Sequence, residues 1–291
     1  MDFLTAFLLG ALQGVLEFFP VSSTGHLVFV EQITAFEAPR LLFHAFLHIG
    51  SVIAVIYVFR RDVFRLVIES GRILADVLRN MKEFIGSLLK GSDPDYIKVI
   101  RTNYRKLVVM LTAASIPTFA GGILLRGAAE TLSGSVMYTG VGLLMTGIIL
   151  LVSSMLRPMD EMPKDIPYWK IFVIGAAQGL SVLPGVSRFG VTLSGGILCG
   201  LGKMTAVRIS FLMLIPVSLG ALAEELAVSI PAGVMAGRTA GICLTGMAAS
   251  AVFGILLMKR LLRFVRVRDL KGFAYYCFCA GAISVMIGFF L

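Results

Sequence analysis

The chain has 291 residues, of which 57% are hydrophobic and only 15% are charged, and its formal net charge is +9. Soluble domains carry about 25% charged residues, so this chain has too few to cover a water-facing surface. The composition excludes a cytosolic enzyme, a disordered protein and a disulfide-stapled secreted module, and predicts an all-α integral membrane protein.

Six segments are long and apolar enough to cross a membrane as helices: 41–59, 107–125, 135–156, 207–223, 239–258 and 272–291. Two further apolar stretches, 3–19 and 169–201, are interrupted by Pro, Gly, Ser and charged residues, which makes them poor simple spans. The first stretch also lacks the basic start and the cleavage site of a removed signal peptide.

The segment 60–106 alternates charged residues with apolar ones such as Leu66, Ile73 and Val77. This pattern is typical of helices that lie on a membrane surface. We expect a cytoplasmic amphipathic insertion formed by a helix pair.

The distribution of Lys and Arg predicts the orientation. The loops at 60–106, 259–271 and 157–170 hold eleven, six and three basic residues, whereas those around 126–134 and 224–238 hold one each. The positive-inside rule therefore places the first three in the cytoplasm and the last two outside. This role in orientation also accounts for the positive net charge, so no nucleic-acid partner is expected.

This orientation places both ends of 1–40 outside and both ends of 169–203 inside. Each interrupted stretch must then enter the membrane and return, as a re-entrant helix pair followed by three spanning helices. The result is a single membrane domain, 1–291, with two inverted-topology repeats at about 1–156 and about 169–291. Gln13 and Gln178 begin similar strings in the two stretches, which independently supports the repeat.

The first interrupted stretch places polar groups at membrane depth. Gln13 and Glu17 are four residues apart and share a helix face. An ionisable residue there marks function, because its insertion costs about 2.5–3.5 kcal/mol. Beyond the following Pro, the run supplies hydroxyls, backbone N–H groups suited to an anion, and a proton-transfer group: Ser22, Ser23, Thr24, Gly25 and His26.

The second stretch contributes Arg188, the only basic residue between Lys170 and Lys203, with Ser187 and Thr192 beside it. A guanidinium flanked by hydroxyls and backbone N–H groups is well suited to phosphate. A structural ion pair between Arg188 and Glu17 is the alternative interpretation. Together the two stretches would suit a substrate with a phosphate head and an apolar tail.

Three other groups of residues receive simpler interpretations. The pair His44 and His48, four residues apart, favours helix packing or an outer-side lining over a metal site. Glu224 and Glu225 fall at an outer helix end, where we expect them to be solvated. The four cysteines lack CxxC spacing and are interpreted as small core residues: Cys199, Cys243, Cys277 and Cys279.

The strings Gln13-x-x-x-Glu17, Pro-Val-Ser-Ser-Thr-Gly-His at 20–26 and Pro-Gly-Val-Ser-Arg at 184–188 closely resemble the bacitracin-resistance type of undecaprenyl-diphosphate phosphatase. The resemblance covers nearly the whole chain. It implies a multi-pass plasma (inner) membrane enzyme with interlocked repeats. The reaction would release the terminal phosphate of undecaprenyl diphosphate at a site opening to the outer face, regenerating the carrier for cell-envelope glycans.

The resemblance also implies roles and a divalent cation, Mg²⁺ or Ca²⁺. Glu17 would bind the metal or transfer a proton, Ser23 would be the nucleophile or a phosphate ligand, and His26 its acid/base partner, while Arg188 would hold the diphosphate. The expected substrate-binding residues are Gln13, Ser22, Thr24, Gln178, Ser187 and Thr192.

One departure concerns Phe189, which stands where the family usually has Ser. It puts in doubt a role for this position, and we expect Phe189→Ser to keep or raise activity.

A polyprenyl-phosphate flippase using the same anion site is the main alternative, because inverted repeats with broken helices are also a transporter design. Expected partners are the polyprenyl diphosphate substrate and membrane lipids. The sequence leaves open whether the chain forms a homodimer.

Overall fold

The computed structural model describes residues 3–34, 39–156, 166–235, 237–267 and 269–290, and these form helices without any strand. The helices are α1 (Phe3–Leu16), α2 (Ser23–Ile33), α3 (Arg40–Val58), α4 (Arg60–Lys90), α5 (Asn103–Leu132), α6 (Val136–Ser154), α7 (Tyr168–Gly179), the short 3₁₀ helix η2 (Leu180–Val182), α8 (Arg188–Leu198), α9 (Lys203–Ser229), α10 (Arg238–Val267) and α11 (Leu270–Phe290). The all-α prediction is confirmed.

All six predicted spans are present, as α3, α5, α6, α9, α10 and α11, and each is long and apolar enough to cross a membrane. Three of them, α5, α9 and α10, extend several residues past the predicted apolar segments. The helical backbone continues into the flanking charged residues because an α-helix satisfies its own hydrogen bonds in lipid and in water alike. The chain is therefore a multi-pass membrane protein.

The two interrupted stretches form helix pairs, as predicted. In the first, α1 ends at Leu16 and α2 begins at Ser23; in the second, α7 and η2 are followed by α8 from Arg188. Proline at 20 and 184 interrupts each stretch, since its ring cannot continue a regular helix.

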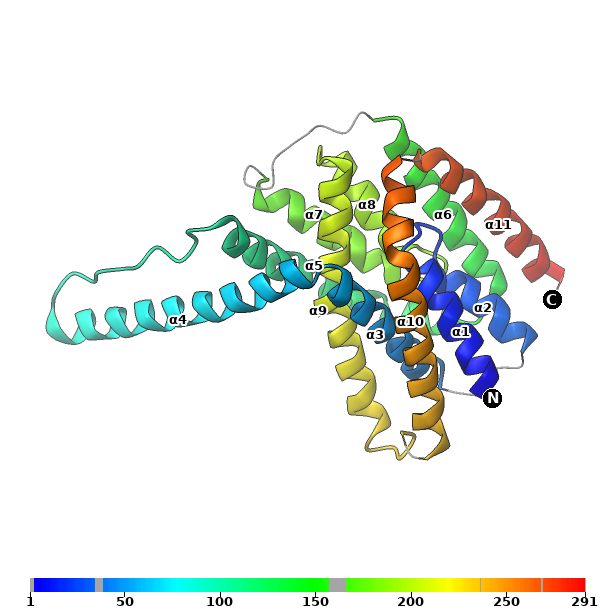
Figure 1. Cartoon of the computed structure of the whole chain (residues 1–291), viewed down its shortest axis with the longest axis horizontal. Coiled ribbons are helices and arrows are strands. Elements are labelled where there is room, and N and C mark those ends of the chain that lie inside the picture. Colours follow the sequence, from blue (N-terminus) through cyan, green and yellow to red (C-terminus); the bar gives the residue numbers. More distant parts are fainter. Residues whose placement is uncertain (1–2, 35–38, 157–165, 236, 268, 291) are drawn as a thin grey trace.

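Helices from the two halves pack on one another (Figure 1). α1 and α3 lie against α10, α5 lies against α7, and α6 runs along α11. This arrangement brings residues far apart in the sequence around one centre. The inverted-topology relation between the halves stays a prediction.

Small residues allow the closest of these approaches. A Cβ at Gly14 would lie 2.4 Å from the carbonyl oxygen of Ser250, and one at Gly10 would lie 2.2 Å from that of Gly246. Close backbone contact of this kind is how membrane helices associate when lipid offers no hydrophobic driving force. It seats α1 firmly against α10.

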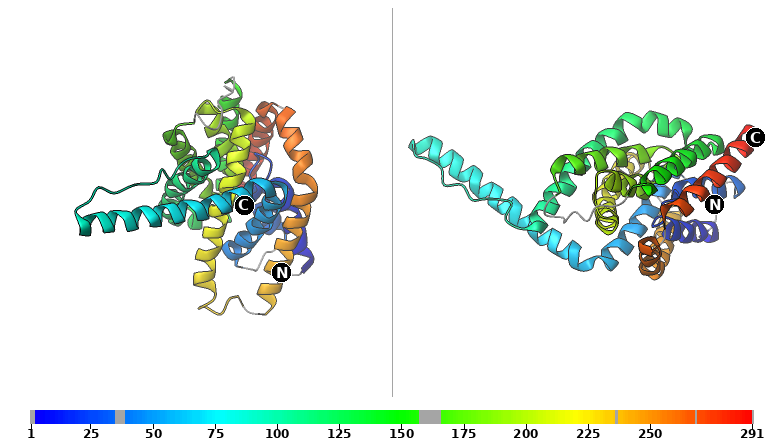
Figure 2. Two further views of the ribbon diagram at one scale, coloured as in Figure 1. Left: turned by 60° about the vertical axis from the view of Figure 1, so that its left-hand side comes forward. Right: turned by 90° about the horizontal axis from the view of Figure 1, so that it is seen from above.

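The segment 60–106 differs from its prediction. α4 is a single 31-residue amphipathic helix that projects from the other helices (Figures 1 and 2), and residues 91–102 return without a helix. The expected helix pair is wrong because Gly91, in the left-handed conformation, ends α4, and Pro94 follows closely.

The return segment is fastened to α4 by polar contacts. Asn80 exchanges two 2.8 Å hydrogen bonds with the backbone of Ile97. Arg105, in the first turn of α5, donates to Glu69 at 2.8 Å and to Asp76 at 2.6 Å, and these hydrogen bonds lower the pKa of both carboxyls. Most of the apolar face of α4 stays uncovered, with Leu66 its buried residue.

The prediction for the cysteines is right for Cys243 and Cys277, which are buried. It is wrong for Cys279, which is exposed on α11, and for Cys199, which is only partly buried. A membrane helix also presents apolar residues outward, so an apolar segment does not identify the core-facing side.

We predict that Gly14→Ala destabilises the protein by about 1–3 kcal/mol, because the added methyl group must push α1 away from the backbone of α10. Gly71→Ala in α4 is the matched control: its Cβ meets nothing within 4 Å, so it should leave stability unchanged or slightly raised. Thermal unfolding of both variants in detergent tests this, and equal melting temperatures would contradict it.

Candidate functional site

A buried ion pair joins the two broken stretches. Glu17 lies in the turn after α1 and is 4% exposed, and its Oε1 accepts a 3.1 Å hydrogen bond from Nε of Arg188, the first residue of α8. The ion pair that the sequence offered as an alternative therefore exists. It does not exclude phosphate binding, because Nη2 of Arg188 is buried without a hydrogen-bond partner in the described part of the chain.

Other polar groups gather around the Glu17 carboxylate. Its Oε2 accepts hydrogen bonds from Ser23 Oγ at 2.6 Å and from Gln13 Nε2 at 2.9 Å. Nδ1 of His48 lies 3.0 Å from Gln13 Nε2 and 3.6 Å from Glu17 Oε2. Within the described residues, Gln13 Oε1 is buried and unpaired.

The first turn is held in an unusual backbone conformation. Ser22 has φ +62° and is the only residue other than glycine with positive φ in the described structure. Its hydroxyl accepts from the Gly25 N–H, and its carbonyl accepts from His26 Nδ1 at 2.8 Å. This conformation directs Ser23, at the N-terminus of α2, toward Glu17.

The second turn is supported by α6. Thr146 Oγ1 accepts from the Ser187 N–H at 3.0 Å and donates to the Gly185 carbonyl at 3.1 Å. Gly185 has φ +81°, and a Cβ there would lie 2.0 Å from the Thr139 carbonyl oxygen. Only glycine fits this turn, which presents Arg188 and the N-terminus of α8 to the site.

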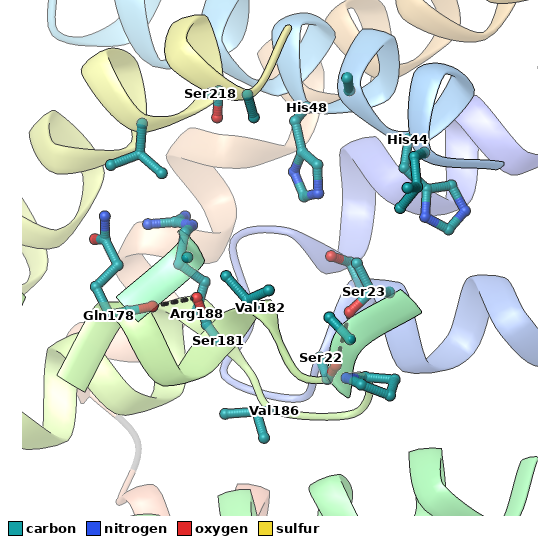
Figure 3. A pocket seen from close by; sticks show the side chains of 18 of the residues that line it. Ser22, Ser23, His44, His48, Gln178, Ser181, Val182, Val186, Arg188 and Ser218 are labelled. Atoms are coloured by element: carbon teal, nitrogen blue, oxygen red, sulfur yellow. Dashed lines mark hydrogen bonds between the residues drawn. The ribbon is translucent and has the colours of Figure 1, made fainter. Parts of the chain in front are cut away.

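These groups line one end of a cavity of about 330 Å³ (Figure 3). The predicted residues on its wall are Glu17, Ser22, Ser23, Thr24, Gln178, Ser187 and Arg188. Both amide atoms of Gln178 are buried and have no hydrogen-bond partner among the described residues. Unpaired buried polar atoms are rare in native proteins, so those lining this cavity indicate a polar ligand.

The rest of the cavity has mainly apolar walls, and charged side chains lie at its far end. Its walls include Val28, Phe119, Val182 and Leu214, and its far end is lined by four charged residues: Arg126, Glu130, Glu224 and Glu225. Arg126 pairs with Glu130 and Glu224. Glu224 is thus exposed as expected but ion-paired, while Glu225 is only partly exposed.

Three predicted site residues, Gln13, Thr192 and His26, do not line the cavity. Thr192 lies one turn into α8, where its hydroxyl bonds to Ser210 Oγ and to the Arg188 carbonyl. His26 Nε2 lies 2.6 Å from the hydroxyl of Tyr276, and the two rings stack. The role of His26 as acid/base partner of Ser23 stays a prediction; Glu17, not His26, contacts the Ser23 hydroxyl.

Sequence reasoning undervalued His44 and His48. Both line the cavity, and Figure 3 shows their rings pointing from α3 toward it. The signal was available: two of the three histidines of the chain stand four residues apart on one helix face. Of the two interpretations of His44 and His48, lining of a cavity is therefore correct, and simple helix packing is not.

The donor set permits a cation, although no group of three or more His, Cys, Asp or Glu suited to a metal occurs in the described structure. The oxygens near Glu17 are its own carboxylate, the unpaired Gln13 Oε1 and the Ser23 hydroxyl. Mg²⁺ is often bound by one or two carboxylates plus substrate phosphates and water. The residues present fit such a site.

Phe189 belongs to the core and also lines the cavity beside Arg188. It is 1% exposed, and its ring stacks on that of Phe211 at 4.6 Å. A serine there would replace a packed aromatic ring, so we expect a cost in stability; the effect of Phe189→Ser on activity stays a prediction.

The comparisons with known proteins agree with this picture. The family model described as bacitracin resistance protein BacA matches residues 6–283. An undecaprenyl-diphosphatase of Methanosphaera stadtmanae is 33% identical over 99% of this chain and 98% of its own length. One of Korarchaeum cryptofilum is 34% identical and one of Alkaliphilus metalliredigens 31%, each over 97% of both chains.

We predict that Glu17→Gln lowers the free energy of unfolding by about 3–5 kcal/mol, because it leaves the Arg188 charge buried without its partner. Arg188→Gln should cost a similar amount. The double variant should cost clearly less than the sum of the two, since it buries no uncompensated charge. Unfolding of all four proteins in detergent gives the comparison, and strictly additive losses would show that the pair is not coupled.

We also predict that Phe189→Ser lowers the free energy of unfolding by about 3–5 kcal/mol, the usual cost of removing a buried aromatic ring. Phe84→Ser is the control, because Phe84 is 51% exposed on α4 and should change stability far less. The check is again detergent unfolding; equal effects would mean that the Phe189–Phe211 stack contributes little.

Proposed function

The chain belongs to the bacitracin resistance protein family, and from this we infer that it hydrolyses undecaprenyl diphosphate to undecaprenyl phosphate and inorganic phosphate. Its relatives carry the name of that phosphatase, so the flippase alternative is not favoured. The activity would recycle the lipid carrier used for cell-envelope glycans.

The cavity is the observation that carries this function. One end holds a guanidinium, hydroxyls and unpaired amide atoms, and the walls beyond are apolar. Phe119, Ile123 and Val182 on these walls are exposed apolar side chains. A lipid with a phosphate head and a long apolar chain has the same division of chemistry.

We assign the end of the cavity lined by Ser22, Ser23, Gln178 and Arg188, here called the anion end, to the diphosphate. Arg188 Nη2 and the Gln178 amide have hydrogen bonds to offer, and α2 and α8 present their N-termini at Ser23 and Arg188. Helix N-termini stabilise phosphate through free backbone N–H groups. Ser22, Thr24 and Ser187 line the same end and complete the set.

A divalent cation, Mg²⁺ or Ca²⁺, would be held by Glu17 and the unpaired Gln13 oxygen. Glu17 and Arg188 neutralise each other, so the resident pair leaves little net positive charge for a diphosphate. A bound cation would supply that charge and so stabilise the negative charge of the phosphate oxygens during transfer.

The contacts of Ser23 indicate how attack on the phosphorus begins. Its hydroxyl donates to Glu17 at 2.6 Å, within the range expected for a general base and its target. The attacking oxygen is that of Ser23 or of a water in its place, and Glu17 accepts its proton. His26 fixes the Ser22 carbonyl and thereby the turn that carries Ser23.

We place the protein in the plasma (inner) membrane with the cavity opening to the outer face. The charged end of the cavity lies at the ends of α5 and α9. The loops that follow hold few basic residues, which is typical of the outer side.

We predict that purified protein releases phosphate from C55 polyprenyl diphosphate, and that EDTA abolishes the release by removing the cation. Arg188→Ala should lower kcat by about 100-fold or more, as loss of a key oxyanion ligand does. Ser23→Ala should lower it about as much.

Arg61→Ala, an exposed position on α4, is the control and should keep wild-type activity. Release at the wild-type rate by Ser23→Ala would refute the assigned role of Ser23. No release by folded wild-type protein would refute the function itself and favour transport.

A further inference from the structure

A buried carboxylate lies beside the cavity but has no part in the chemistry above. Glu31 on α2 is 1% exposed, and its Oε1 lies 2.5 Å from Nε2 of His44 on α3. Arg40 Nε approaches the other oxygen at 3.5 Å. A charged residue is rarely buried this fully unless it is paired. The contact with His44 therefore helps to keep this carboxylate buried, and the question is what the pair does.

The pair has the form of a carboxylate that orients an imidazole. Because Nε2 of His44 is occupied by Glu31, Nδ1 is the nitrogen left for a group in the cavity, and His44 is on the cavity wall. Carboxylate–histidine pairs fix the tautomer and the ring orientation, and they stabilise the imidazolium when it forms.

The position of His44 along α3 would place it near the bridging oxygen and the lipid phosphate of the substrate. His48 contacts Gln13 and approaches Glu17 at the anion end, and His44 lies one turn closer to the N-terminus of α3. The cavity continues in that direction to Leu41. With the terminal phosphate at Arg188 and Ser23, the bridging oxygen and the lipid phosphate would lie toward His44.

The other histidines are less suited to meet the leaving group. Both ring nitrogens of His26 already have partners, the Ser22 carbonyl and the Tyr276 hydroxyl, and the residue is absent from the cavity wall. His48 is engaged beside Gln13 and Glu17.

We propose that His44 is a catalytic residue that protonates the leaving lipid phosphate, and that Glu31 is the residue that positions it. The proposal rests on the proposed phosphatase function. The terminal phosphorus forms a bond to the attacking oxygen, whose proton passes to Glu17. The bond from that phosphorus to the bridging oxygen breaks, and its electron pair stays on the bridging oxygen.

The bridging oxygen then takes the proton from Nδ1 of protonated His44. His44 regains a proton from water through the open end of the cavity, and Glu17 releases the proton it received. When attack is by Ser23, a water oxygen then bonds to the phosphorus of the phosphoserine, the bond to Ser23 Oγ breaks, and Oγ takes a proton from that water. One water is thus consumed per diphosphate, and both side chains return to their starting forms.

Several charged groups surround His44 and bear on any pH dependence. Glu31 from α2 contacts it directly, and Arg40 from α3 lies behind Glu31. Glu17, His48 and Arg188 share the cavity, and Arg126, Glu130, Glu224 and Glu225 from α5 and α9 line its far end. Of these, only Glu31 contacts the ring, so its replacement is the selective test.

The test is the pH profile of kcat for C55 polyprenyl diphosphate. An essential acid gives an alkaline limb, in which activity falls as the acid loses its proton. We expect His44→Gln to lower kcat by about 100-fold or more with little change in KM and to remove this limb. Glu31→Gln should displace the limb, because an amide cannot replace the carboxylate that orients the ring.

Glu83→Gln, which changes an exposed carboxylate on α4 in the same way, is the matched control and should reproduce the wild-type profile. An alkaline limb that is unchanged in both His44→Gln and Glu31→Gln would overturn the proposal. If the wild-type protein releases phosphate in the same assay, the phosphatase function is unaffected by that result. Should His44→Gln fail to fold, the shift in Glu31→Gln decides alone. Absence of wild-type phosphate release would instead overturn the function.

Discussion

The site depends on one interaction, the buried ion pair between Glu17 and Arg188. Each partner is carried by a different interrupted stretch, and neither charge could remain at this depth without the other. The pair therefore requires two broken helices, one from each half of the chain, to meet at one point. The glycine contacts of α1 with α10 and the support of the second turn by Thr146 hold the two stretches where this can happen.

The charges of Glu17 and Arg188 cancel before substrate binds, and this determines how the charge of a diphosphate must be compensated. Because Arg188 is already balanced by Glu17, a diphosphate brings negative charge that the protein has not compensated. Hydrogen bonds from the unpaired atoms and helix N-termini would offset part of it, and a cation on Glu17 and Gln13 would offset the rest. The apolar walls make each of these contacts stronger by excluding water.

The three histidines illustrate how packing assigns roles to identical side chains. His26 follows the Ser-Ser-Thr-Gly run directly, yet its ring is held by Tyr276 and supports the Ser22 turn. His44 is distant in sequence from that run, yet it lies on the cavity wall with a buried carboxylate behind it. Proximity along the chain is therefore a poor guide to which imidazole lines the cavity.

The sequence by itself determined the membrane class, the six spans, the two interrupted stretches and most of the anion end, including Glu17, Ser23 and Arg188. These follow from local hydropathy, from prolines that break helices, and from the cost of burying a charge, all of which are readable along the chain. Only the tertiary structure decided that α4 is a single helix, that Phe189 packs on Phe211, and that His44 rather than His26 lines the cavity. Those outcomes depend on contacts between residues up to 250 positions apart, such as His26 with Tyr276, and no local pattern encodes which helix faces will meet.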